Sequence, residues 1–170
     1  MNLKSLKKLA VAVAFGTAVL AAGCVAGAAG NMTIGVTSFA DTLEPTEQYF
    51  SWVISRYGVG QGLTKFDEEG NMVPCLATEW SGSEDGKTWT FTLRDDVKFS
   101  NGNDMTPELV KASLERTIEM SNRVPEFFDI DNIEIDGQNI IYHLNRANAN
   151  MARCLADPLF LIMDTSIENS

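Results

Sequence analysis

The chain has 170 residues and a net charge of −10, with 23 acidic residues against 13 basic ones. This excess of acid disfavours nucleic acid as a partner, because phosphate binding is driven by Lys and Arg. The sequence has a single histidine, His143, and no Cys-x-x-Cys pair, so it indicates no zinc site. We expect no resident metal and no cofactor, and we interpret His143 as a structural residue of a strand.

The first 24 residues have the pattern of an export signal. Three lysines precede an uncharged apolar segment, residues 9–20, that is too short to span a bilayer comfortably. The segment from Leu20 to Cys24 resembles the lipobox of bacterial lipoproteins, so we expect residues 1–23 to be removed and Cys24 to carry a lipid. Cleavage after Ala28 is the alternative, because Leu20 lies four residues before Cys24 instead of the usual three. A lipid on Cys24 would hold an exported protein at a membrane surface.

The part of the chain that follows predicts a tether, a strand and a helix. Residues 24–31 are small and featureless and predict the tether, and residues 32–38 predict a short strand. A polar turn is expected at 41–45. The aromatic-rich segment 46–57 predicts a helix with Thr46 as its N-cap.

The middle of the chain predicts short strands joined by tight turns. A strand at 62–66 is expected before a turn at 67–71, and Asp85-Gly86 is a strong hairpin signal because Gly tolerates positive φ. Residues 88–93 alternate threonines with Trp89, Phe91 and Leu93. This period of two predicts an apolar face turned inward and a threonine face turned outward. Val97 and Phe99 indicate a further short strand.

The last part of the chain predicts a helix, a second hairpin and two short elements. Thr106 is the expected N-cap of a helix whose residues Val110, Leu114 and Ile118 face a core. A hairpin is expected at 130–144, a short helix at 148–156 and a strand at 160–163. We therefore expect a mixed α/β body.

Two interpretations of Cys75 and Cys154 stay open. They could form a disulfide, because the compartment outside the cytoplasm is oxidising. They could equally be two small buried hydrophobic residues.

Three segments carry a resemblance to a known family. They are Leu-Ala-Thr-Glu-Trp at 76–80, Asp-Gly-Lys-Thr-Trp-Thr-Phe-Thr-Leu-Arg at 85–94 and Val-Lys-Phe-Ser-Asn-Gly at 97–102. In this order and spacing they resemble the extracytoplasmic solute-binding proteins of the peptide/nickel family (family 5), which serve ABC importers. The resemblance extends over about residues 32–165 and is strongest to the nickel-binding branch. That branch places an arginine directly after the proline that corresponds to Pro158, and this chain has none there.

The resemblance implies a fold and a division of the chain. The family has a two-lobed periplasmic-binding-protein fold of the class II type, of which this chain would supply only part of lobe one. Residues 32–68 would begin that lobe, residues 69–146 would form an accessory subdomain of hairpins and a helix, and residues 147–170 would return into the lobe, truncated.

The resemblance also implies a function and a site. The protein would be a monomer that captures a small peptide or a nickel complex and hands it to an ABC permease. The implied ligand contacts are Ser38, Phe39, Tyr49, Trp52 and Phe127. Each of these aromatic residues has an alternative interpretation as part of the core.

Three other functions are alternatives to ligand capture. A hydrolase is disfavoured, because the chain has one histidine, no G-x-S-x-G segment and acids scattered through turns. We therefore expect no enzymatic activity. A sensor or receptor-presenting lipoprotein on the same fold, and a truncated fragment without activity, remain as alternatives.

Overall fold

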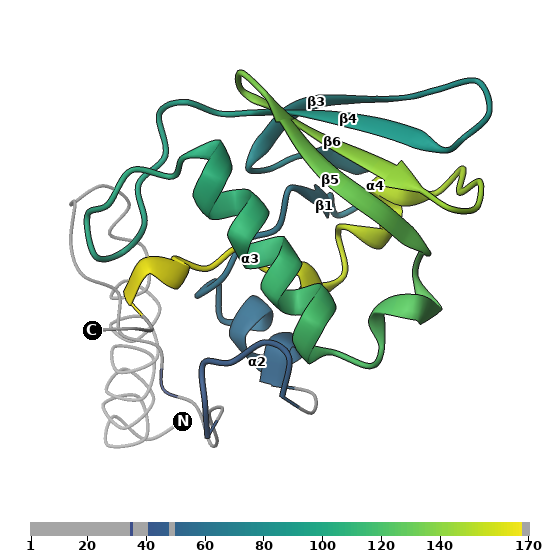
Figure 1. Cartoon of the computed structure of the whole chain (residues 1–170). Helices are drawn as coiled ribbons and strands as arrows, with labels where there is room; N and C mark the ends of the chain where they lie inside the picture. Colours follow the sequence, from purple (N-terminus) through teal and green to yellow (C-terminus); the bar gives the residue numbers. More distant parts are fainter. Residues whose placement is uncertain (1–34, 36–40, 48–49, 168–170) are drawn as a thin grey trace, which may run out of the picture. The chain divides into compact units, whose positions relative to one another are not determined.

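The computed structural model describes residues 35, 41–47 and 50–167 (Figure 1). The expected signal, Cys24, the tether and, apart from Gly35, the strand at 32–38 lie outside these residues, as do Ser38, Phe39 and Tyr49. The described residues from Asp41 onward belong to one compact unit. Within the described ranges, no helix has both the length and the apolar character needed to cross a membrane.

Four antiparallel strands form the main sheet, in the order β3-β4-β6-β5. Their bounds are Ala77–Gly82 for β3, Thr88–Leu93 for β4, Ile130–Asp136 for β5 and Asn139–Leu144 for β6. The turns that join β3 to β4 and β5 to β6 contain Gly86 and Gly137, which have φ angles of 66° and 58°. Only glycine adopts such angles readily, so the two hairpins predicted from Asp-Gly pairs are confirmed.

The two faces of this sheet differ in chemistry, as the alternation in β4 predicts. Phe91 pairs with Ile140 and Trp89 pairs with Tyr142, so these four side chains share one face. Phe91, Ile140 and Tyr142 are fully buried there, while Trp89 stays half-buried. Trp89 lies at the sheet's end, where its ring covers Gly82 and its Nε1 donates to the carbonyl of Asn148 at 2.9 Å. Trp89 therefore lies on the core face as predicted, where it is partly buried against the core.

Helix α3, Pro107–Met120, packs against β5 and β6. Thr106 caps it as expected, because its hydroxyl accepts a hydrogen bond from the backbone N–H of Leu109 at 3.4 Å. Val110 and Leu114 are buried, and Ile118 is partly buried against the same core. The core continues into the segment after β6 through Met151, Leu155, Leu159 and Phe160.

The remaining elements are short. They are α2 Phe50–Arg56, the two-stranded sheet of β1 Thr64–Phe66 and β2 Met72–Pro74, α4 Met151–Cys154, and the 3₁₀ turns η1 Val124–Glu126, η2 Pro158–Phe160 and η3 Thr165–Ile167. Figure 1 shows α2 and α3 on the same side of the four-stranded sheet. The strand expected at 62–66 and the helix expected at 148–156 are present in shortened form as β1 and α4.

Two predictions about these short elements are wrong, and one stays a prediction. The described part of α2 begins at Phe50, and the N–H groups that Thr46 would cap lie outside the described residues; its hydroxyl donates to the Glu44 carboxylate at 2.5 Å. Val97 and Phe99 form no strand, since this loop makes a single bridge between Lys98 and Asp104. Residues 160–163 form no strand either.

The last of these errors has a local cause. Phe160 ends a 3₁₀ turn, and the extended residues after it make one backbone bond to the segment before β1, from Ile162 N to Gln61 O at 2.9 Å. A strand needs a continuous ladder of such bonds.

Cys75 and Cys154 are both free thiols and both half-buried. The thiol of Cys154 lies 3.5 Å from the carbonyl oxygen of Phe127, and the side-chain amide of Asn148 lies 3.6 Å from its sulfur. Of the two open interpretations, the disulfide is not formed in this structure.

Candidate ligand-binding site

The two described candidate residues lie on elements that meet at η2. Helix α2, which carries Trp52, packs against η2. Phe127 meets Phe160 of η2 edge to face, with ring centroids 5.2 Å apart. Trp52 keeps 47% of its surface exposed, whereas Phe127 is half-buried. We call this place, formed by α2, Phe127 and Pro158–Phe160, the η2 corner.

Phe127 is held at this corner by its backbone. Its N–H donates to the carbonyl of Val124 at 3.0 Å, and its own carbonyl accepts from the side-chain amide of Asn148 at 3.0 Å. The next residue, Phe128, stacks on Phe160 at 5.1 Å and is buried. The two adjacent phenylalanines thus have different environments. Phe128 belongs to the core, and Phe127 covers the edge of the core at a partly exposed position.

An arginine that sequence reasoning missed lies over Phe127. The Cζ atom of Arg123 is 5.8 Å from the centroid of the Phe127 ring. Its Nη1 atom is enclosed and has no hydrogen-bond partner among the residues that the structure describes.

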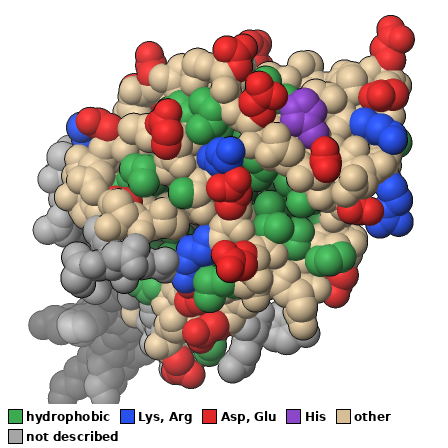
Figure 2. All heavy atoms as spheres, viewed as in Figure 1, with side chains coloured by type: hydrophobic (Ala, Val, Ile, Leu, Met, Phe, Trp, Pro, Cys, Tyr) green, Lys and Arg blue, Asp and Glu red, His purple; other side chains and the backbone are tan. Residues whose placement is uncertain are grey.

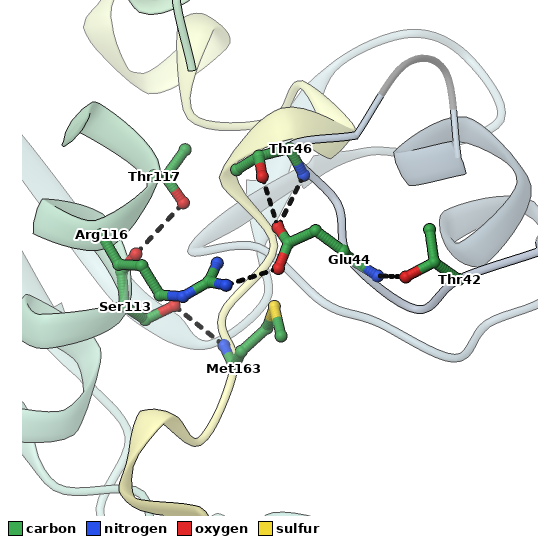
Figure 3. A network of polar contacts seen from close by, with 7 residues as sticks. All are labelled: Thr42, Glu44, Thr46, Ser113, Arg116, Thr117 and Met163. Atoms are coloured by element: carbon green, nitrogen blue, oxygen red, sulfur yellow. Dashed lines mark hydrogen bonds and ion pairs between the residues drawn. The ribbon is translucent and has the colours of Figure 1, made fainter. Parts of the chain in front are cut away.

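A network of polar contacts fixes the segment before α2 to α3 (Figure 3). Arg116 Nη2 donates to Glu44 Oε2 at 2.6 Å, and both the backbone N–H and the hydroxyl of Thr46 donate to Glu44 Oε1. Burial raises the pKa of Glu44, but the hydrogen bonds from Arg116 and Thr46 together outweigh it, so the pKa lies below its ordinary value. Ser113 on the same helix accepts from the N–H of Met163 at 2.9 Å. Glu44 is therefore a structural carboxylate that ties the first described segment to α3.

Two hollows lie elsewhere on the unit. The first, about 570 Å³, lies between residues 43–45, 58–61, 97–101 and 161–164 and is lined mainly by apolar side chains. The second, about 560 Å³, lies between the C-terminal end of α3, η1 and the beginning of β5. Figure 2 shows the same view of the molecule as Figure 1. Acidic side chains are scattered over this face, and hydrophobic side chains gather on part of it.

Neither hollow is lined by Trp52 or Phe127. The cation at each is already paired, Lys98 with Asp104 in the first and Arg146 with Asp129 at 3.0 Å in the second. Trp52 on α2 is instead an exposed aromatic side chain, and Arg123 over Phe127 has no carboxylate within ion-pair distance among the described residues. The side chains of the η2 corner and the neighbouring Arg123 are therefore the better candidates for recognition of a small polar molecule.

No group of three His, Cys, Asp or Glu side chains within the described ranges is placed to hold a metal ion. His143 lies on β6 with its Nε2 3.1 Å from Glu134 Oε2 on β5. Its neighbours across the sheet are Thr88 and Asn132, which share the face opposite the core.

Comparison with known proteins gives a consistent result. Residues 71–169 match the family described as bacterial extracellular solute-binding proteins, family 5 Middle. The nickel-binding periplasmic protein of Escherichia coli K12 is 46% identical over 65 residues, which cover 38% of this chain and 12% of that protein. The probable D,D-dipeptide-binding periplasmic protein DdpA of the same organism is 34% identical over 112 residues, or 62% of this chain and 21% of that protein.

A solved structure supports the same assignment. The crystal structure described as a nickel ABC transporter from Bacillus halodurans superposes with a TM-score of 0.71 and 34% identity, covering 77% of this chain and 27% of that one. The chain thus spans well under a third of the length of each of these relatives. The predicted fold class is confirmed for the part that is present. The chain belongs to the bacterial extracellular solute-binding proteins of family 5.

Proposed function

We propose that the protein is the ligand-capturing component of an ABC importer for peptides or nickel complexes, and that it works with a permease in the membrane. The observation that carries this proposal is the match of residues 71–169 to a family of solute-binding proteins. The names of the relatives support the two ligand classes, since one binds nickel and another is a probable D,D-dipeptide-binding protein. The role is binding without catalysis.

The ligand contacts that we propose are Ser38, Phe39, Tyr49, Trp52 and Phe127. The exposure of Trp52 supports this assignment. With 47% of its surface exposed, the large ring contributes less to the hydrophobic core than a buried ring would. Phe127 supports it less strongly, because its contact with Phe160 also makes it a packing residue. Trp52 is thus the residue on which the assignment is best tested.

We also propose that the protein is exported as a monomer and held by a lipid on Cys24, in the periplasm or at the outer face of the cytoplasmic membrane. The family's description as extracellular supports the export. The basic, apolar and lipobox segments of the first 24 residues support the anchor. The anchor would keep the binding unit close to its permease.

A titration followed by NMR tests the binding function. We expect L-alanyl-L-alanine, or a nickel–histidine complex, to shift the indole resonance of Trp52 and backbone resonances of the η2 corner in a saturable way but with weak affinity, because this chain would supply at most one wall of the cleft. Trp52→Ala should weaken binding by about tenfold, roughly the value of one well-placed aromatic contact, without lowering the melting temperature. The matched control is Phe66→Ala on β1, because Phe66 is also an exposed aromatic residue. If neither probe shifts any resonance of the protein, the proposed function is wrong.

A further inference from the structure

We propose that Asn101 is a site of spontaneous deamidation, in which the backbone nitrogen of Gly102 displaces the side-chain amide, and that the acid formed releases the 97–104 loop from Asp164. Asn101-Gly102 is the single Asn-Gly pair of the sequence. Because glycine has no side chain, its nitrogen can approach a neighbouring carbonyl group closely. The inference is independent of the ligand and of the proposed transport role.

The reaction uses water as its only co-reactant. The nitrogen of Gly102 gives up its proton and attacks Cγ of Asn101, so that an N–Cγ bond forms, the Cγ–Nδ2 bond breaks and ammonia leaves with the proton. Water then adds to one of the two carbonyl carbons of the cyclic imide and breaks its bond to the ring nitrogen. Opening at Cγ gives aspartate, and opening at the backbone carbonyl gives isoaspartate, whose main chain runs through Cβ and Cγ. Either product has a carboxylate in place of the amide.

Hydrogen bonds hold both reacting groups while the loop is closed. The Nδ2 of Asn101 donates to Asp164 Oδ2 at 2.8 Å, and its Oδ1 accepts from the backbone N–H of Asn103 at 3.0 Å. The attacking nitrogen is held as well, because the N–H of Gly102 donates to the carbonyl of Phe99 at 2.9 Å. The reaction therefore proceeds from molecules in which the loop has opened, and its rate follows their population.

The loop is placed to open without unfolding of the core. Its residues 100–104 are exposed, and the bridge at its base joins Lys98 and Asp104, which are both exposed. An exposed ion pair contributes little to stability. The buried acceptor on the facing segment is Asp164, so its hydrogen bonds to the loop are the main restraint on opening. Segments with few buried contacts open at a lower cost than the core does.

The acid that forms at position 101 no longer fits beside Asp164. The hydrogen bonds from Ser166, Asn101 and Asn103 hold the pKa of Asp164 well below its ordinary range, so its carboxylate is ionised. A second carboxylate at the place of the Asn101 amide replaces a hydrogen bond by repulsion between like charges. The deamidated loop therefore stays open. Because the loop and residues 161–164 line the same hollow of about 570 Å³, deamidation loosens one wall of that hollow.

Peptide mapping by mass spectrometry tests the site. The intact chain is kept in a mildly alkaline buffer, which favours loss of the Gly102 proton, and is sampled over time. We expect conversion of the amide to aspartate and isoaspartate at Asn101. Asn103 is the internal control, because its amide donates to the same oxygen of Asp164 at 2.8 Å but the next residue, Asp104, has a side chain. Asn103 should keep its amide.

Two variants test whether the contact with Asp164 controls the rate. Asp164→Ala removes the acceptor and should speed deamidation of Asn101 by about tenfold, because the loss of a charge-assisted hydrogen bond raises the population of the open loop. The matched control is Ile140→Val, since Ile140 is fully buried in the core and this change weakens the fold without touching the loop. The rate in this control should stay within about twofold of the unmodified chain, because loop opening does not need the core to unfold.

Asn101→Asp introduces one of the two products directly. We expect faster hydrogen exchange at the backbone N–H groups of Phe99 and Met105, which donate to carbonyl groups of the loop. Asn132→Asp makes the same change of charge at an exposed position of β5 and should leave the exchange of these two groups unchanged.

Three results would overturn the proposal. One is a peptide map in which Asn101 keeps its amide or loses it no faster than Asn103 does. Another is a rate that Asp164→Ala leaves unchanged, or that Ile140→Val raises as much, because the contact with Asp164 would then not control the reaction. The third is an Asn101→Asp variant whose loop N–H groups exchange as slowly as those of the unmodified chain.

Discussion

Single carboxylates in this protein join segments that are far apart in the sequence. Asp164 Oδ2 accepts hydrogen bonds from the amides of Asn101 and Asn103, each at 2.8 Å, and its Oδ1 accepts from the hydroxyl of Ser166 at 2.6 Å. The bond from Ser166 and those from the two asparagines hold the pKa of Asp164 well below its ordinary range, against the opposing effect of burial. The ionised carboxylate therefore fastens the 97–104 loop to the segment after η2.

Replacement of Asp164 by asparagine should lower stability in a pH-dependent way. The folded state lowers the pKa, so the ionised group stabilises the fold at pH values above about 4, the ordinary pKa of aspartate. We expect Asp164→Asn to cost about 1–3 kcal/mol at neutral pH, since it removes charge-assisted hydrogen bonds. Below about pH 4 the cost should shrink, because the unfolded wild-type chain then takes up a proton that the folded chain resists.

Urea unfolding at neutral pH and at about pH 3 measures this effect. Asp131→Asn is the control, because Asp131 is exposed on β5 and should change stability by less than about 0.5 kcal/mol. A cost of Asp164→Asn that is the same at both pH values would contradict the argument.

At the scale of elements, β4 organises the unit. It lies between β3 and β6 in the sheet, and its buried Phe91 contacts aromatic rings from three strands. The ring centroids of Trp80, Trp89 and Tyr142 lie 6.5, 6.4 and 5.6 Å from that of Phe91. The alternation of threonine and aromatic residues thus places one strand at the centre of both the hydrogen-bond ladder and the core.

Truncation of Phe91 should therefore be severe. Phe91 has none of its surface exposed, so Phe91→Ala should destabilise the protein by about 3–5 kcal/mol through lost burial and the cavity left behind. Thr90→Ala, on the opposite face of the same strand, should cost no more than about 1 kcal/mol. The free energy of unfolding in urea checks both values. A loss below about 1 kcal/mol for Phe91→Ala would mean that the aromatic cluster contributes little to the fold.

At the scale of the whole molecule, the family match and the expected export signal lie in different parts of the chain. The described unit carries the family match and the η2 corner, whereas the expected signal and Cys24 lie outside the described residues. The proposed lipid on Cys24 would be the link between the unit and the membrane. A diacyl anchor supplies this link through buried acyl chains and needs no spanning helix.

Metabolic labelling with a palmitate analogue tests the anchor. We expect the unmodified chain to be labelled and to stay with the membrane fraction, and Cys24→Ala to lose both properties. Cys75→Ala, which removes a free thiol of the folded unit, should be labelled normally. Equal labelling of the unmodified chain and Cys24→Ala would contradict the lipobox interpretation and favour cleavage after Ala28.

The sequence by itself determined the local framework of this protein. Glycine after aspartate at 85–86 and 136–137 requires a tight turn, the alternation at 88–93 requires a two-faced strand, and Thr106-Pro107 requires a helix start. All three are confirmed, because each depends on residues adjacent in the chain. The spacing of the motifs at 76–102 likewise indicated the family that the comparisons confirm.

Only the tertiary structure decided which distant side chains meet. Glu44 binds the hydroxyl of Thr46 and is itself held by Arg116 of α3, a contact between distant segments that no local pattern records. The expected strand at 160–163 failed because a ladder depends on the neighbouring segment as well as on β-branched residues. Arg123 was missed for the same reason: its place over Phe127, with no counter-ion among the described residues, exists only once α3, η1 and η2 have packed together.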